Sequence, residues 1–277
     1  MTAEVLLMVV ACGLYVAASG LAVHRLVRAA PSRGRGMAPL LSAAAVCLVA
    51  VLALRGLRLE RIPAFGIFEA LVWYGLSVTL AYLCMAVRHD TRGVSGILLP
   101  FVTVVVIGSL AGMHTQVVAD AQIQTAWLGL HIAAAFVGYG MFTLESFLAI
   151  AYLIQDRNLK RKRFGRVFHR LPPLEALDQL MHEQIGFAFL MFSLSIVLGV
   201  FLTHRFGWGT LWTTDPKVAG AAATWLVYAI LFHLRLTADR HGRRMAMVAL
   251  AGLACVLVTF LGVHLMTSSI HDFISPK

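Results

Sequence analysis

Eight long apolar runs, separated by short polar segments, constrain the fold of this chain more than any other feature. The runs span residues 4–24, 38–54, 66–88, 94–113, 127–154, 184–204, 217–236 and 245–268. Most of them reach the roughly 20 residues that an α-helix needs to cross the hydrocarbon of a bilayer. Lipid offers no hydrogen-bond partner to backbone groups, so each run is expected to be helical. The sequence therefore predicts an all-α polytopic membrane helix bundle, with about eight transmembrane helices in a single membrane domain, residues 1–277.

The composition supports the bilayer as the solvent of this chain. Hydrophobic residues make up 60% of the 277 residues and charged residues only 13%, which is more apolar than a soluble domain of this size requires. The net charge of +10 does not indicate nucleic acid, because the basic residues lie in short runs between apolar segments. The four cysteines lie inside apolar runs without a C-x-x-C pair. They are expected to be small buried hydrophobic residues rather than disulfides or metal ligands.

The distribution of Lys and Arg predicts the orientation of the bundle. The loops after the first, third, fifth and seventh runs hold 17 of the 23 basic residues, and the positive-inside rule places those loops in the cytoplasm. Both termini then face outward, on the periplasmic side of a bacterial inner membrane. Arg25 and Arg28 follow the first run, so that run is expected to be a retained helix rather than a signal peptide. Segment 171–181 has apolar residues on one face and is predicted to be an interfacial helix.

Five histidines are expected at the outer level of the membrane. His131 begins the fifth run, His204 ends the sixth, and His114, His264 and His271 lie at the ends of the fourth and eighth runs. A single histidine at a membrane edge is more often a hydrogen-bonded or interfacial residue than a ligand. Several histidines at one level favour axial ligation of a metal, because neutral imidazole is a good ligand.

The outer loop R-F-G-W-G-T-L-W-T-T-D-P-K, residues 205–217, is rich in aromatic side chains. Trp208 and Trp212 are four residues apart, so a helical turn would place both rings on one face. One interpretation is the aromatic belt found in many membrane proteins. The other is a flat hydrophobic shelf for a planar macrocycle, with Arg205 and Lys217 available to pair with its carboxylates.

Two ionisable residues fall in the inner half of the predicted spans, Glu145 and His233. An unpaired charge at such a depth costs roughly 3 kcal/mol or more, so both are expected to face the bundle interior and to find a partner. One hypothesis is that His233 contacts a cofactor inside the bundle, with Glu145 supporting it. The alternative is a structural hydrogen bond between the two side chains.

Five stretches occur in an order that is typical of one family of membrane proteins. They are W-L-G-L-H (127–131) leading into G-Y (138–139), L-D-Q-L-M-H-E-Q-I-G-F (177–187), W-G-T-L-W-T-T-D-P-K (208–217), T-W-L-V-Y-A-I-L-F-H-L-R (224–235) and L-G-V-H-L-M-T-S-S-I-H-D-F (261–273). Over roughly residues 125–275, the chain resembles the cytochrome c assembly family of haem-handling membrane proteins. Within that family it resembles the system II haem-lyase subunit and its eight-helix relatives.

The resemblance implies a site for haem b at the outer face. The residues at the matching positions are His131 and His271 as ligands of the haem iron, His233 as the transmembrane histidine on the route of haem, and Trp208, Trp212 and Asp215 as the Trp-rich motif. Two positions depart from the usual W-x-W-D-P-K-E pattern of the family. Thr214 stands where the Trp before the Asp is usual, and Val218 stands where an acidic residue follows the Lys.

The resemblance implies that the chain moves or presents haem at the outer face of the membrane, where an apocytochrome c would receive it. The family's second transmembrane histidine comes from a partner membrane subunit, so this chain is not expected to act as a haem lyase alone. The alternative is a non-catalytic subunit of the same fold, which regulates haem synthesis or scaffolds another complex without binding haem. The departures at Thr214 and Val218 favour that alternative. A solute transporter would be indicated by inverted repeats, which the sequence does not display.

Overall fold

The computed structural model describes residues 3–28, 37–91, 93–113, 125–207, 211–237 and 242–259. These ranges hold helices and no strand. The helices are α1 (Ala3–Val27), α2 (Ala38–Leu59), α3 (Ile67–Arg88), α4 (Val94–Ser109), α5 (Ala126–Lys160), α6 (Leu174–Arg205), α7 (Pro216–Thr237) and α8 (Arg243–Leu257), with short 3-10 turns at Leu110–Gly112 and Leu211–Thr214. Seven of the described helices are long and apolar enough to cross a membrane. The rest of the eighth predicted span, beyond residue 259, lies outside the described residues. The prediction of an all-α membrane bundle is confirmed.

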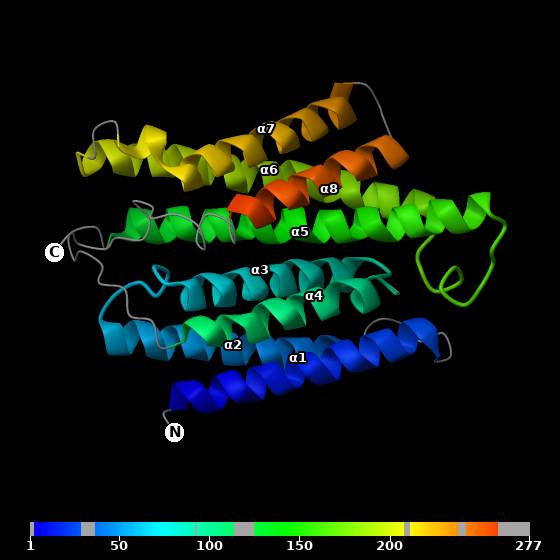
Figure 1. Ribbon diagram of the computed structural model, residues 1–277, viewed down its shortest axis with the longest axis horizontal. Coiled ribbons are helices and arrows are strands. Elements are labelled where there is room, and N and C mark those ends of the chain that lie inside the picture. Colours follow the sequence, from blue (N-terminus) through cyan, green and yellow to red (C-terminus); the bar gives the residue numbers. More distant parts are fainter. Residues whose placement is uncertain are drawn as a thin grey trace.

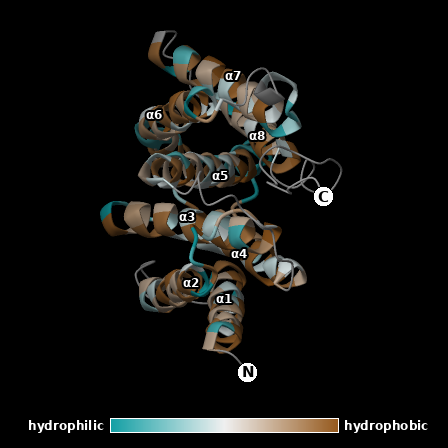
Figure 2. Ribbon diagram, turned by 90° about the vertical axis from the view of Figure 1, so that its left-hand side faces the viewer, coloured by the Kyte–Doolittle hydropathy of each residue, from teal (hydrophilic) through white to brown (hydrophobic). Residues whose placement is uncertain are grey.

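Consecutive helices run antiparallel and form two groups, α1–α4 and α5–α8, which are visible in Figure 1. Helix α3 packs against α5 and makes the main contact between the groups. Figure 2 views the bundle along its helices and places the second group on the opposite side of α3 from α1 and α2. Following the predicted orientation, we call the end where α1 begins the outer end. Helices α5 and α7 also begin there, and α6 ends there.

The surface of the bundle is apolar along the middle of its helices, as lipid requires. Val46, Val104 and Val197 are 67%, 70% and 65% exposed, and hydrophobic colouring covers most of the ribbon in Figure 2. Inside the bundle, hydroxyl groups pair across helices. The Tyr15 hydroxyl of α1 lies 2.7 Å from Thr79 Oγ1 of α3, and hydroxyl groups make similar bonds that involve α4, α5 and α8. These bonds satisfy polar groups that lipid could not satisfy.

Helix α6 is longer than its predicted span, and it includes the segment that was predicted as a separate interfacial helix. The helix begins at Leu174, directly after Pro172 and Pro173, and no Gly or Pro interrupts it before residue 186. Leu177 and Met181 are fully buried in the bundle core. The apolar face of this segment therefore packs on protein rather than on lipid, and the prediction of an interfacial helix was wrong.

Candidate functional site

A cavity of about 380 Å³ lies between the outer halves of α5, α6 and α7, with the start of α3, the segment before it and the end of the described part of α8 completing the wall. The lining is mostly aliphatic and aromatic. Along α5 it extends from Leu128, near the outer end, to Tyr139. These residues are eleven apart, which corresponds to about 16 Å along a helix. The cavity therefore reaches from the outer end toward the middle of the bundle.

His131 is the histidine that lines this cavity. Its Nδ1 lies 2.7 Å from the backbone carbonyl oxygen of Ser195 on α6, and this bond is made when Nδ1 carries the proton and donates it. A neutral imidazole in that tautomer has its lone pair on Nε2, the nitrogen through which such a histidine binds a metal. Gly199, one turn further along α6, leaves room for the ring, because a Cβ there would lie 3.1 Å from His131 Cε1. The sequence predicted His131 as a site residue, but not Ser195 or Gly199.

Aromatic rings that pack against one another form the inner end of the cavity. Tyr139 and Phe192 both line it, and their ring centroids are 4.8 Å apart. Phe142 packs edge-on against Phe192 at 5.4 Å and stacks on Tyr228 of α7 at 3.5 Å. These rings join α5, α6 and α7 at the middle of the bundle. They separate the outer cavity from the polar residues of the inner half.

The D-P-K stretch of the outer loop begins α7 and brings a cation to the cavity. Asp215 is 4% exposed, and its Oδ1 accepts hydrogen bonds from the backbone N–H groups of Lys217 and Val218 at 2.8 and 3.3 Å. Asp215 is therefore the N-cap of α7, and Pro216 occupies the first helical position that suits proline. Lys217, one residue further, lines the cavity.

Other residues of the predicted outer site are described only in part. Trp208 and His271 lie outside the described residues, as do His114 and His264. The backbone of Trp212 lies in the 3-10 turn Leu211–Thr214 that precedes α7, and its side chain is not among the described parts. His204 is exposed at the end of α6 and is not part of the cavity lining.

His233 lies on the exposed face of α7 rather than inside the bundle. The buried residues of this helix include Tyr228, Leu231 and Arg235, which follow one face at helical spacing. His233 is two residues from Leu231 and from Arg235, and two residues turn an α-helix by about 200°. The expectation that His233 faces the interior was therefore wrong for the chain on its own.

Glu145 faces the interior, as expected, and is fully buried. Neither of its carboxylate oxygens has a hydrogen-bond partner among the described residues, so the alternative of a hydrogen bond to His233 is not realised. Its electrostatic partner is Arg235, which is 1% exposed and whose Nη1 lies 3.5 Å from Asp178 Oδ1. The charge count of the sequence groups Arg235 with the loop after the seventh run, although it lies at the end of that run. A buried Glu145 needs a counter-charge, and this need could have indicated from the sequence that Arg235 is buried.

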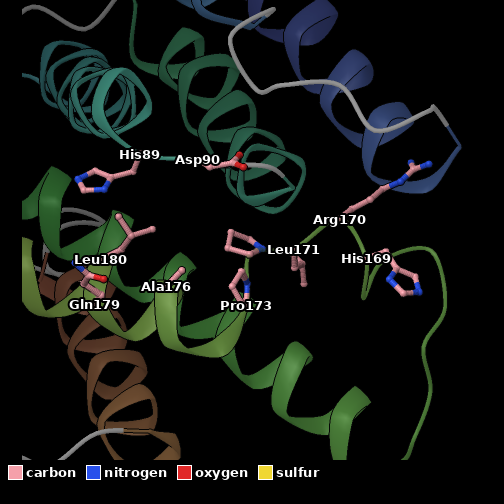
Figure 3. A pocket seen from close by; sticks show the side chains of 10 residues that line it. His89, Asp90, His169, Arg170, Leu171, Pro173, Ala176, Gln179 and Leu180 are labelled. Atoms are coloured by element: carbon pink, nitrogen blue, oxygen red, sulfur yellow. The ribbon is translucent and has the colours of Figure 1, made fainter.

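A second cavity, of about 280 Å³, opens at the inner end beside the start of α6. Figure 3 shows that the Arg170 side chain extends toward α1 and that His169 points away from Leu171 and Pro173. Arg170 donates a hydrogen bond to the backbone carbonyl of Arg25. The polar side chains of this cavity do not converge on one point, so the outer cavity is the better candidate for a ligand site.

Comparisons with known proteins agree with the resemblance seen in the motifs. The family model described as "Cytochrome C assembly protein" matches residues 62–271. The cytochrome c biogenesis protein CcsA of Parasynechococcus marenigrum is 29% identical over 259 residues, which cover 84% of this chain and 85% of that protein. The CcsA proteins of Microcystis aeruginosa and Guillardia theta are 26% and 25% identical, and they match 82% and 83% of this chain and 84% and 82% of their own lengths. The matched region includes the cavity wall from Ala64 to Thr259. The chain thus belongs to the family of cytochrome c assembly proteins.

Proposed function

We propose that this protein takes part in cytochrome c biogenesis by binding haem b in the outer cavity and presenting it at the outer face of a bacterial inner membrane. The observation that carries the proposal is the position of His131 in an apolar cavity, with Nδ1 bonded to the Ser195 carbonyl. Relatives named for cytochrome c biogenesis support the same role. The acceptor of the haem would be an apocytochrome c.

The residues of the cavity fit such a ligand. Its volume of about 380 Å³ lies within the range of roughly 300–1,000 Å³ that is usual for small-molecule sites. His131 and, by its motif position, His271 would hold the haem iron. The aromatic and aliphatic walls would exclude water from the ring. Lys217 on the wall supplies a cation that suits a carboxylate.

The chemistry that haem supplies when bound is the reactivity of its own vinyl groups toward thiols, so the protein has to provide position rather than a catalytic group. The Ser195 carbonyl orients the His131 ring and makes Nε2 the more basic nitrogen. Asp215 caps α7 and thereby fixes Lys217 at the cavity. Each interaction pairs a side chain with a backbone group of a helix, and helices hold a ligand more precisely than loops do.

The exposed face of α7, which carries His233, supports a partner membrane subunit. Among the candidate spans of the described residues, α7 buries the smallest share of its apolar stretch. We propose that a helix of the partner covers this face and supplies the second transmembrane histidine. In this arrangement, haem ligation at His233 belongs to the complex and not to this chain alone.

The test is the absorption spectrum of the detergent-purified protein from haem-replete cells, before and after dithionite. Wild-type protein should have a Soret band that shifts on reduction. His131→Ala combined with His271→Ala should abolish the band, whereas His204→Ala, which changes an exposed histidine of the same level, should leave it unchanged. A double variant with the wild-type spectrum would refute the ligand assignment.

A second candidate function is favoured by the residues at positions 214 and 218. Thr214 and Val218 replace a Trp and an acidic residue that are usual in the family motif. A chain that kept the fold and lost haem ligation would act as a regulatory or scaffolding subunit. Wild-type protein that is colourless, with its partner bound and the cells supplied with haem, would support this second function over the first.

A further inference from the structure

Three charged residues are buried together at the outer end of the first helix group. Arg55 of α2 is 1% exposed, Glu4 of α1 is 4% exposed and Glu69 of α3 is fully buried. Arg55 Nε lies 2.6 Å from Glu69 Oε1, and Arg55 Nη1 lies 2.8 Å from Glu4 Oε1. Arg55 also donates to the carbonyl of Met113, at 3.2 Å. One guanidinium therefore joins α1, α2, α3 and the turn after α4.

Buried ion pairs are costly to desolvate and add little stability on average, so their presence calls for another reason. Here the cluster lies beside the outer cavity. Glu69 is the third residue of α3, and Gly66 immediately precedes that helix. A Cβ at Gly66 would collide with Glu69 Oε2, so the carboxylate lies directly against this glycine. Gly66 and Ala70, on either side of Glu69 in the sequence, both line the cavity.

The segment before α3 forms the part of the cavity wall that the first helix group contributes. Ala64, Phe65 and Gly66 line the cavity, and Phe65 packs with Leu128 and Leu202 in a small apolar cluster of its own. This segment is neither helix nor strand, and few hydrogen bonds hold its backbone. The N–H groups of Arg61 and Ala64 donate to the carbonyls of Gly56 and Ile62 at 3.3 and 3.0 Å, and Trp73 Nε1 donates to the Pro63 carbonyl at 2.8 Å. Its position therefore also depends on side-chain contacts.

Glu69 contacts this segment from the side away from the cavity. Arg61, the first residue of the segment, has its Nη2 3.7 Å from Glu69 Oε1, and its guanidinium lies 5.3 Å from the Phe65 ring. Burial lowers the pKa of Arg61, and the Glu69 carboxylate opposes that shift. Arginine remains charged in either case. One carboxylate thus pairs with both the anchor, Arg55, and Arg61, the residue that begins the segment before α3.

We propose that Glu69 is a positioning residue of the outer cavity: with Arg55 as its anchor, it holds the segment of residues 61–66, of which Ala64, Phe65 and Gly66 line the site. Glu4 stabilises the same arginine and does not contact this segment. The expected effect of Glu69 on ligand binding rests on the proposed binding of haem. The expected effect of Glu69 on the position of residues 61–66 does not rest on it.

The test compares Glu69→Gln with Glu4→Gln in the full-length protein. Both substitutions neutralise a buried partner of Arg55, so both should lower thermal stability by similar amounts. Glu69→Gln alone should increase the amide hydrogen exchange of residues 61–66. It should also accelerate haem loss to a haem-scavenging protein by about tenfold, as expected for a weakened charge-assisted bond. Glu4→Gln should leave both of these measurements at wild-type values.

Gly66→Ala tests the same contact without changing any charge. The added methyl group would displace the Glu69 carboxylate, while the backbone φ of −104° at Gly66 accepts alanine. Exchange of residues 61–66 should rise as in Glu69→Gln. Gly129→Ala is the matched control, because its Cβ would make an ordinary contact of 3.7 Å with Ile62.

Two results would overturn the inference: equal exchange of residues 61–66 in the Glu69 and Glu4 variants, or wild-type exchange in Glu69→Gln. If the wild-type protein bound no haem, the proposed function would fail, and the exchange measurement would still decide whether Glu69 positions the wall. If haem bound, the wall loosened and the rate of haem loss stayed at the wild-type value, the role of Glu69 in ligand binding would be refuted.

Discussion

At the scale of single residues, the contrast between His131 and His233 shows what one sequence can reveal. Both were found from their type and depth. The orientation of His233 depends on which face of α7 is buried, and that face includes Arg235, an arginine that the charge count groups with the following loop. The environment of His131 depends on the Ser195 carbonyl and on the missing side chain of Gly199. A backbone carbonyl has no sequence signature, so this part of the site could not be predicted.

The close approach of Gly199 to the His131 ring predicts that a larger residue at position 199 would displace the imidazole. In Gly199→Ala, the new methyl group would lie 3.1 Å from His131 Cε1 and 3.4 Å from Nδ1, which forces the ring to shift. We expect weaker haem binding, by about tenfold for a cost near 1.4 kcal/mol, and an altered Soret maximum. Haem titration of the purified protein measures both.

Gly13→Ala in α1 is the control for this substitution. A Cβ at Gly13 would meet nothing within 4 Å, so its effect is limited to the higher helix propensity of alanine. Haem affinity in Gly13→Ala should equal that of the wild type. If Gly199→Ala also bound haem normally, the ring would not be confined as the structure indicates.

At the scale of elements, the apolar runs predicted where the helices lie but not where they end. Hydropathy marks the part of a helix that crosses lipid, whereas the ends are decided by caps and prolines. Helix α5 continues to Lys160 and α6 begins at Leu174, both beyond the apolar runs. The D-P-K stretch was noted for its family resemblance, and the structure adds a local reason for it. The aspartate caps α7, and the proline begins it.

The cap predicts the result of Asp215→Ala. Loss of the two hydrogen bonds from Lys217 and Val218 should destabilise the start of α7 by about 1 kcal/mol. Amide hydrogen exchange at residues 217–219 should therefore increase. Asp156→Ala is the control, since it removes a surface pair with Lys160 on α5 that is worth only a few tenths of a kcal/mol. Unchanged exchange at the start of α7 would contradict the capping role.

At the scale of the whole molecule, the composition alone required a membrane, and the arrangement of charges predicted its orientation. The contact between the two helix groups could not be predicted from the sequence, because it depends on α3 packing against α5. The ion-pair cluster around Arg55 could not be predicted either. Arg55 counts as an outer-loop residue in the charge distribution, although it is buried between Glu4 and Glu69.

The orientation predicts which positions an impermeant maleimide can reach in intact spheroplasts. The four native cysteines are first replaced by alanine. A cysteine at position 204, exposed at the outer end of α6, should be labelled, whereas one at position 165, exposed between α5 and α6 at the inner end, should be labelled only after lysis. The opposite pattern would invert the topology and place the cavity at the cytoplasmic face.

The central claim is that the His131 imidazole binds haem iron inside the outer cavity, and His131→Gly tests it most directly. Removing the side chain leaves a space that free imidazole can enter, because the apolar cavity and the Ser195 carbonyl remain. We predict that the variant loses the low-spin spectrum of the wild type and that millimolar imidazole restores it. Wild-type spectra for His131→Gly without added imidazole would contradict the account.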